Sequence, residues 1–298
     1  MNQNENYLKQ ATAVVQTEGI LSEMDLEILS DEEGKKRVAG NVTVKTGDIN
    51  FTKFQISSNE FTKGGKENPS YQNILGFMER AHSIAEVGEE SATRVSIRSG
   101  QLNPYTTFND MGAKIHGVSY KTGFISIIKK EDCNPHSIFK VECYVNDVEN
   151  ELDTETQIQT GRVILHTLVP IYNNGIENLD IVVPEEFAMA AQRLFTQQGR
   201  ESAYIQGNIG NTTEVQEYTV DFEIGGQVTE TETKTVNELV LTNAKTMEVP
   251  YELETIQKAI AEYDIVLEAK RKKRMESSKK NNGNKTANGA SARRSFGF

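Results

Sequence analysis

Aromatic rings and cations recur together on the predicted strands of the first half of this chain. Tyr105, between a proline and two threonines, is expected on a hairpin that lifts it away from the core, with Phe108 three residues later. Lys53, Arg94 and Arg98 alternate with apolar residues, which places them on the strand face opposite the core. Rings of this kind stack on nucleobases with about 1–3 kcal/mol per base, while cations follow phosphates. These five residues therefore predict a groove for single-stranded nucleic acid.

The second half carries residues of the same types in analogous places. They are Arg162, His166, Tyr172 and Tyr204. Filling of the core is the alternative role for Phe108, Tyr172 and Tyr204, and a solvated strand face is the alternative role for the arginines. Tyr105 is the ring for which the groove is the stronger interpretation.

The elements that must position these residues begin with a two-stranded unit and a helix. Apolar and polar residues alternate over residues 38–44 and again over 51–56, with a Gly-Asp turn between them. Apolar residues at three- and four-residue spacing over 74–85 predict a helix that ends near Gly88 and packs on the strands.

The segments on either side of this unit carry weaker signals. Residues 1–19 contain a few helix-compatible residues with little periodicity, and residues 31–35 predict an exposed turn. After the helix, residues 93–98 alternate as a strand, residues 100–104 predict a turn, and residues 105–108 begin the partner strand.

The second half repeats this order of elements about 110 residues later. Pro184 and two following carboxylates suit the first turn of a helix, which Gly199 is expected to close. Apolar residues from Tyr251 onward predict a C-terminal helix. The remaining predicted elements are strands at 124–128 and 138–145, strands at 161–169 and 179–183, a strand at 203–206, a turn at 207–211, and strands at 218–222 and 238–242.

This order predicts a mainly β protein with inserted helices. Two five-stranded barrels, each with a helix inserted midway, describe the oligonucleotide/oligosaccharide-binding architecture. The expected division is an N-terminal extension (1–34), a first oligonucleotide-binding-like domain (35–130), a second (131–248), a C-terminal helix (249–274) and a disordered basic tail (275–298).

Charge is unevenly distributed along the sequence. The chain has a net charge of −11, yet residues 270–298 contain ten Lys or Arg and one Glu, which leaves −20 on the remainder. An acidic body repels polyphosphate, so a groove for nucleic acid requires that cations gather on one face. The basic tail ends in aromatic residues that predict a docking tip, formed by Arg293, Arg294, Phe296 and Phe298.

Composition and spacing argue against several other classes of protein. No phosphate-binding loop, nucleophile elbow or paired-histidine spacing is present, so we expect no enzyme, no metal and no cofactor. Two cysteines exclude a disulfide-stapled scaffold, and the polar N-terminus lacks a secretory signal. The longest apolar run is far shorter than the ~20 residues of a membrane span, so no membrane partner is expected.

Several segments resemble a phage-encoded single-stranded DNA-binding protein of the oligonucleotide-binding class. They are Gly161-Arg162-Val163, residues 169–175, the Pro184 helix, Gly207-Asn208-Ile209 and the tail with terminal Phe298. The resemblance implies that barrel aromatics and cations bind DNA and that a C-terminal tip recruits replication and recombination enzymes. The basic residues before Phe298 depart from the acidic tips of the bacterial type, and the chain has no Trp.

The leading hypothesis is therefore a protein that coats and protects single-stranded DNA in phage-type replication or recombination, by base stacking and phosphate neutralisation. The alternative is a virion or assembly protein built from paired β domains, with a metal-dependent nuclease as a distant third. Single-stranded DNA is the expected partner, with replication or recombination proteins at the tip and a homo-oligomer left open. The expected location is the cytoplasm, that of the host if the protein is phage-encoded.

Overall fold

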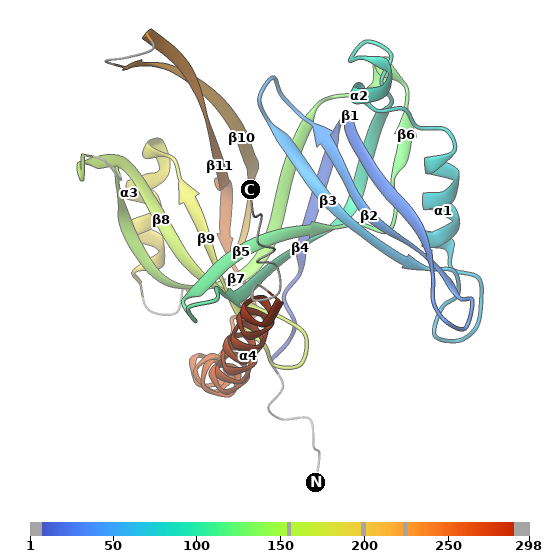
Figure 1. Cartoon of the computed structure of the whole chain (residues 1–298). Helices are drawn as coiled ribbons and strands as arrows, with labels where there is room; N and C mark the ends of the chain where they lie inside the picture. Colours follow the sequence, from blue (N-terminus) through green and yellow to red (C-terminus); the bar gives the residue numbers. More distant parts are fainter. Residues whose placement is uncertain (1–7, 154–155, 198–200, 223–225, 289–298) are drawn as a thin grey trace, which may run out of the picture.

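A computed structural model of the chain describes residues 8–153, 156–197, 201–222 and 226–288. It shows a mainly β protein with a few helices, as the sequence predicts (Figure 1). Eleven strands are hydrogen-bonded into one sheet in the order β10-β11-β9-β8-β7-β1-β2-β3-β5-β4-β6, with additional pairings between β10 and β7 and between β1 and β4. These additional pairings bend the sheet back on itself in two places.

The first five strands pair in a closed circuit, here named the first circuit. β1 (Ala13–Ser30) pairs antiparallel with β2 (Lys36–Lys45), and β2 pairs antiparallel with β3 (Phe51–Asn59). β3 lies parallel to β5 (Lys114–Lys121), β5 pairs antiparallel with β4 (Arg94–Phe108), and β4 returns to β1. The predicted pair of strands at 38–44 and 51–56 is confirmed by β2 and β3.

Two short helices connect β3 to β4. α1 (Pro69–Met78) begins at Asn68, whose side chain accepts a hydrogen bond from the Ser70 backbone, and buries Tyr71, Ile74 and Phe77 against the strands. A break follows before α2 (Ile84–Val87), so the single helix predicted to end near residue 88 is in fact two. β6 (Ser126–Ile128) pairs with the start of β4, and a 3₁₀ turn (Lys130–Asp132) leads into the second half.

The next five strands repeat the same connectivity and form the second circuit. β7 (His136–Leu152), β8 (Gln159–Pro170) and β9 (Ile176–Val183) pair antiparallel in sequence order. β9 lies parallel to β11 (Gly226–Thr246), which pairs antiparallel with β10 (Ser202–Phe222), and β10 returns to β7.

The helix of the second circuit lies between β9 and β10. α3 (Glu185–Phe195) begins after Pro184 with two carboxylates in its first turn, as predicted. It buries Ala188, Ala191 and Phe195. The residue expected to close it, Gly199, lies outside the described residues.

The two circuits share strand pairing and one hydrophobic core. β1 pairs antiparallel with β7 between them, and the core contains Phe54 of the first circuit together with Phe139 and Ile205 of the second. Asn50, before β3, donates to the Ile209 carbonyl at 3.1 Å and accepts from the Asn211 backbone at 2.8 Å. The division into two domains at residue 130 stays a prediction.

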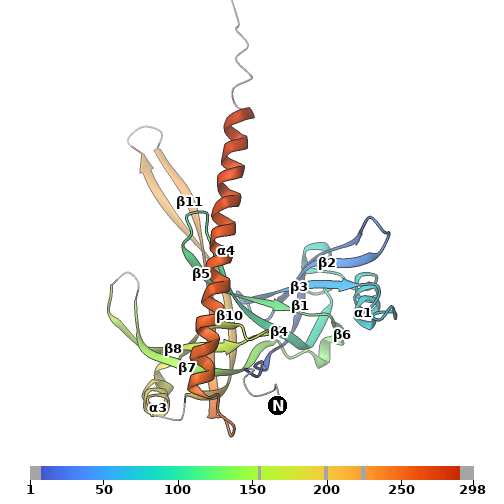
Figure 2. The ribbon, with the colours of Figure 1, turned by 90° about the horizontal axis from the view of Figure 1, so that it is seen from below.

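α4 (Leu253–Asn288) packs beneath both circuits and projects beyond them (Figure 2). The predicted C-terminal helix is confirmed, and Ile256, Ala259 and Leu267 on it are buried. The helix was expected to end at residue 274, and it continues to 288 through a segment that contains no proline. The predicted disorder of the tail is not confirmed for residues 275–288, which the structure describes as helix. No helix in the described ranges is long and apolar enough to cross a membrane.

Two predicted turns and the predicted extension are strands instead. Residues 100–104 lie inside β4, at the point where it passes from pairing with β1 to pairing with β5. Residues 207–211 lie inside β10, which pairs with β11 on both sides of a β-bulge between Gln206 and Gly207. Residues 13–30 of the expected N-terminal extension form β1, which pairs with β2, β4 and β7 and is central to the sheet.

Candidate nucleic-acid interface

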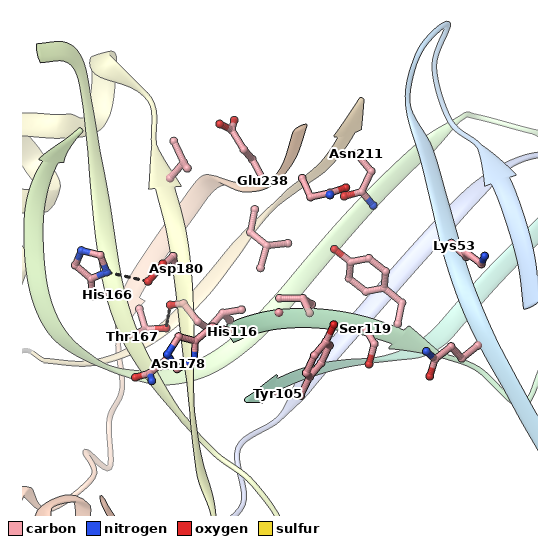
Figure 3. A pocket seen from close by; sticks show the side chains of 18 of the residues that line it. Lys53, Tyr105, His116, Ser119, His166, Thr167, Asn178, Asp180, Asn211 and Glu238 are labelled. Atoms are coloured by element: carbon pink, nitrogen blue, oxygen red, sulfur yellow. Dashed lines mark hydrogen bonds and ion pairs between the residues drawn. The ribbon is translucent and has the colours of Figure 1, made fainter. Parts of the chain in front are cut away.

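A cleft of about 780 Å³ lies between the two circuits. The first circuit lines it with Phe51, Lys53 and Gln55 of β3, Tyr105 of β4, and residues 116–120 of β5. The second circuit forms the opposite wall with residues that include His166, Asn178 and Asp180. Figure 3 shows Lys53 and Asp180 on opposite sides, with Tyr105 between them on the floor strands.

A second hollow of about 780 Å³ adjoins the cleft and shares Asn41 and Gln55 with it. The two hollows therefore form one continuous path over the outer surface of β2, β3 and β5. We name this path the β3 track and define it by the outward side chains that line it. They are Asn41, Phe51, Lys53, Gln55, Gln101, Tyr105, Lys121 and Phe124.

The charge of the β3 track differs from that of the chain as a whole. The sequence has 43 acidic residues, yet the first-circuit lining of the two hollows contains no Asp or Glu. It carries Lys53 and Lys121, both exposed, and neither forms an ion pair within the described part of the chain. Two cations on an otherwise uncharged polar surface can neutralise phosphates locally, although the molecule is acidic.

Tyr105 presents its ring on this path because of the residue opposite it. In the pairing of β4 with β5, Tyr105 faces Gly117, and a Cβ atom at Gly117 would lie only 2.7 Å from the Tyr105 Cζ and hydroxyl oxygen. The ring thus lies over the space that a side chain would fill, and 43% of the residue remains exposed. Phe124, which is 46% exposed, offers a second ring at the far hollow.

The Gly117→Val variant is expected to displace the Tyr105 ring from the strand surface while the protein stays folded, because the ring is free to turn toward solvent. Binding of labelled oligo-dT, measured by fluorescence anisotropy, should weaken about fivefold or more, since stacking contributes about 1–3 kcal/mol per base. Thr107→Val, on β4 outside the lining, is the control. Unchanged affinity of Gly117→Val would show that the position of the ring does not matter.

A buried carboxylate fixes the floor of the cleft. Glu177 of β9, only 3% exposed, accepts hydrogen bonds from the Thr106 hydroxyl at 2.6 Å and from the Tyr263 hydroxyl on α4. Burial together with this hydrogen bond raises the pKa of Tyr263. Because Thr106 gives its proton to Glu177, the nearby His116 Nδ1, 3.0 Å away, is the donor to the Thr106 oxygen. These contacts join β4, β9 and α4 next to Tyr105.

The second circuit presents an acidic wall whose cations are already paired. His166 Nδ1 lies 2.8 Å from Asp180 Oδ1, and its Nε2 lies 3.1 Å from Glu149 Oε2. Burial alone lowers the pKa of His166, but the hydrogen bonds to Asp180 and Glu149 outweigh it and raise the pKa overall. Arg162 is bound by Glu151 and by Glu238, and these hydrogen bonds raise the pKa of Arg162 despite its partial burial.

The structure brings only some of the predicted site residues together. Lys53, Tyr105 and His166 line the cleft, although His166 is paired with carboxylates rather than open to phosphate. Arg98 is exposed on β4 but lies outside the lining of both hollows. Arg94 is directed elsewhere, because its Nη1 donates to the backbone carbonyls of residues 89, 90 and 92.

The other predicted residues are also dispersed. Phe108 is 7% exposed and fills the core, as the alternative interpretation held. Tyr172 is 74% exposed on the turn between β8 and β9, and Lys245 Nζ lies 5.7 Å from the Tyr204 ring centre. Arg162 is held by two carboxylates. The tip residues Arg293, Arg294, Phe296 and Phe298 lie outside the described residues.

Several residues of the track were missed from the sequence. Gln55 follows Lys53 at the period of two that the alternation of β3 already showed, so its outward direction could have been deduced. Lys121 and Phe124 carry no such signal, because β5 pairs with β4 and β3 through contacts distant in the sequence. Among the residues with described positions, no group of His, Cys, Asp and Glu is arranged to hold a metal ion.

The chain is similar to known proteins both in sequence and in fold. The YorF family model matches residues 12–281, which is most of the chain. A search of the curated proteins found no significant match.

Several solved structures are similar to this fold at low identity. Wild-type single-stranded DNA binding protein from Thermus aquaticus has 10% identity and a TM-score of 0.47 over 82% of this chain and 97% of that chain. A deletion mutant of the same protein has 10% identity and a TM-score of 0.47 over 82% of this chain and 98% of that chain. A replication protein A heterotrimer bound to ssDNA has 9% identity and a TM-score of 0.21 over 87% of this chain and 69% of that chain. Since these TM-scores lie below 0.5, the function has to follow from the residues of the cleft and the track.

Proposed function

The chain belongs to the YorF family, and we propose that it binds single-stranded DNA along the β3 track. One observation carries the proposal: exposed rings and unpaired lysines share a path whose first-circuit lining has no carboxylate, in a chain of net charge −11. Rings bind the faces of bases whatever the sequence, and lysines bind the phosphates between them. A single strand offers both groups at once, whereas a duplex hides its base faces.

The architecture supports this assignment. We propose that each circuit is a five-stranded barrel of the oligonucleotide-binding kind, because both have the strand connectivity 1-2-3-5-4-1 and a helix between the third and fourth strands. In that architecture, the face of the second and third strands and the loop between the fourth and fifth bind oligonucleotides. The β3 track lies on β2 and β3 and includes Tyr105 from the β4–β5 ribbon.

The amide side chains along the path suit a ligand that is read without a fixed sequence. Asn41, Gln55 and Gln101 each offer an amide donor for phosphate oxygens, which are the same at every nucleotide. The proposed role has no catalytic step. The protein would coat exposed strands, protect them and remove their secondary structure during replication or recombination of the phage type.

Fluorescence anisotropy tests this function with a labelled oligo-dT and a duplex of the same length. We expect the full chain to bind the single strand at least tenfold more tightly than the duplex, because stacking on Tyr105 and Phe124 requires exposed base faces. Equal binding of both would assign the affinity to the cations of α4 and would contradict the proposal. A single strand of the same length that contains all four bases is the control for sequence preference.

A further inference from the structure

The two walls of the cleft differ in charge and in hydrogen-bonding character. The outward residues of β3 include Lys53 and Gln55, and the corresponding outward residues of β9, the third strand of the second circuit, are Asn178 and Asp180. Both pairs line the same cleft (Figure 3). A strand lying between these walls has an unfavourable interaction if its phosphates face β9 and a favourable one if they face β3. Its bases therefore point toward Asn178 and Asp180.

Asp180 retains the capacity to bind such a base. Its Oδ1 is 2.8 Å from His166 Nδ1, while 65% of the side chain remains exposed on the cleft. An ionised carboxylate has about four lone-pair positions, so one contact with His166 leaves acceptors available. Because His166 is itself held on its other nitrogen by Glu149 at 3.1 Å, it is a positioning residue that fixes the direction of the carboxylate.

We propose that Asp180 is a specificity-determining residue, which accepts a hydrogen bond from the exocyclic amino group of a base and so favours cytosine over thymine. The inference rests on the proposed function of the β3 track. Cytosine presents the N4 amino group as a donor at the position where thymine presents the O4 acceptor, and carboxylates pair with that amino group. Thymine O4 facing a carboxylate would place two acceptors against each other. The chain thus discriminates by a repulsive contact as well as by an attractive one.

The test compares oligo-dC with oligo-dT of equal length at pH 7.5 and moderate salt by anisotropy. The wild-type chain should prefer oligo-dC about fivefold to tenfold, and Asp180→Asn should bring the ratio close to one, because an amide both donates and accepts. Asp48→Asn is the matched control, since Asp48 is an exposed carboxylate outside the lining of both hollows. The control should keep most of the preference.

The outcomes separate this inference from the proposed function. Equal affinity of the wild-type chain for the two oligonucleotides would overturn the role of Asp180 and leave binding by the β3 track intact. An Asp180→Asn variant that binds both more tightly with an unchanged ratio would also overturn it, because Asp180 would then act only by repelling phosphates. Failure to bind either oligonucleotide would overturn the proposed function itself. Since Asp180 is exposed, loss of folding does not obscure these results.

Discussion

Tyr105→Ala should weaken binding of oligo-dT by about fivefold to 140-fold, which corresponds to the loss of about 1–3 kcal/mol of stacking on one base. The ring is 43% exposed, lines the cleft and lies over Gly117, so its removal takes away contact area with little effect on the core. Anisotropy titrations of the full chain at one fixed salt concentration measure the change.

Tyr172→Ala is the matched control for this variant. Tyr172 is more exposed than Tyr105, at 74%, and lies on the β8–β9 turn outside the lining of both hollows. We expect its removal to leave the affinity within about twofold of the wild-type value, because it offers no ring on the track. Equal losses in the two variants would mean that any exposed tyrosine contributes and that the β3 track has no special role.

Gly207→Ala should lower the free energy of unfolding by about 3 kcal/mol, a large effect for one methyl group. A Cβ atom at Gly207 would lie 2.1 Å from the Val240 carbonyl oxygen and 2.6 Å from the Phe139 ring. The backbone of β11 and a fully buried ring cannot both move away without disturbing the core. Urea unfolding followed by circular dichroism measures the loss of stability.

Gly210→Ala provides the control on the same strand. A Cβ atom there would meet only the Glu238 carbonyl, at an ordinary 3.7 Å, so the free energy of unfolding should change by no more than about 0.5 kcal/mol. Similar losses at both glycines would indicate that β10 rejects any side chain for reasons of backbone conformation. A stable Gly207→Ala variant would show that β10 and β11 separate more easily than the close contact implies.

The strands that could be predicted are those whose local pattern matches their burial. The alternation over residues 38–44 and 51–56 survives in the structure because each of these strands has one face toward the core and one toward solvent. The start of α3 was predicted because Pro184 and its two carboxylates act locally, through backbone geometry and the helix dipole.

The strands that were missed depend on partners far away in the sequence. β1 pairs with β2, β4 and β7, and its partners change along its 18 residues. Polar and apolar residues nevertheless alternate over residues 23–28, so this part of the strand could have been deduced from the sequence. Gly100 and Gly207 suggested turns, but each glycine is needed because another part of the protein lies close to its backbone. A Cβ atom at Gly100 would lie 3.0 Å from the Phe54 ring. A glycine required for close approach and a glycine required for a turn look the same in one sequence.

The candidate site was predicted in part for the same reason. Tyr105 was identified because a hairpin was expected to lift it away from the core, whereas it lies within β4. Lys53 was identified because alternation gives the direction of a side chain along a strand. Arg94 and Arg162 were identified on the same basis, but their partners, three backbone carbonyls and two carboxylates, come from segments that the alternation does not describe. Direction alone therefore predicted which residues face outward, and not which of them remain available to a ligand.

The salt dependence of oligo-dT binding tests the central claim, that the lysines of the β3 track neutralise phosphates of a single strand. Each phosphate contact on a single strand contributes about −0.7 to the slope of log K against log salt concentration. The Lys53→Ala/Lys121→Ala variant should therefore have a slope shallower than wild type by about 1.4. The Lys36→Ala/Lys129→Ala variant, with the same charge change at exposed sites outside the lining, should keep the wild-type slope. Equal slopes for all three proteins would contradict the account.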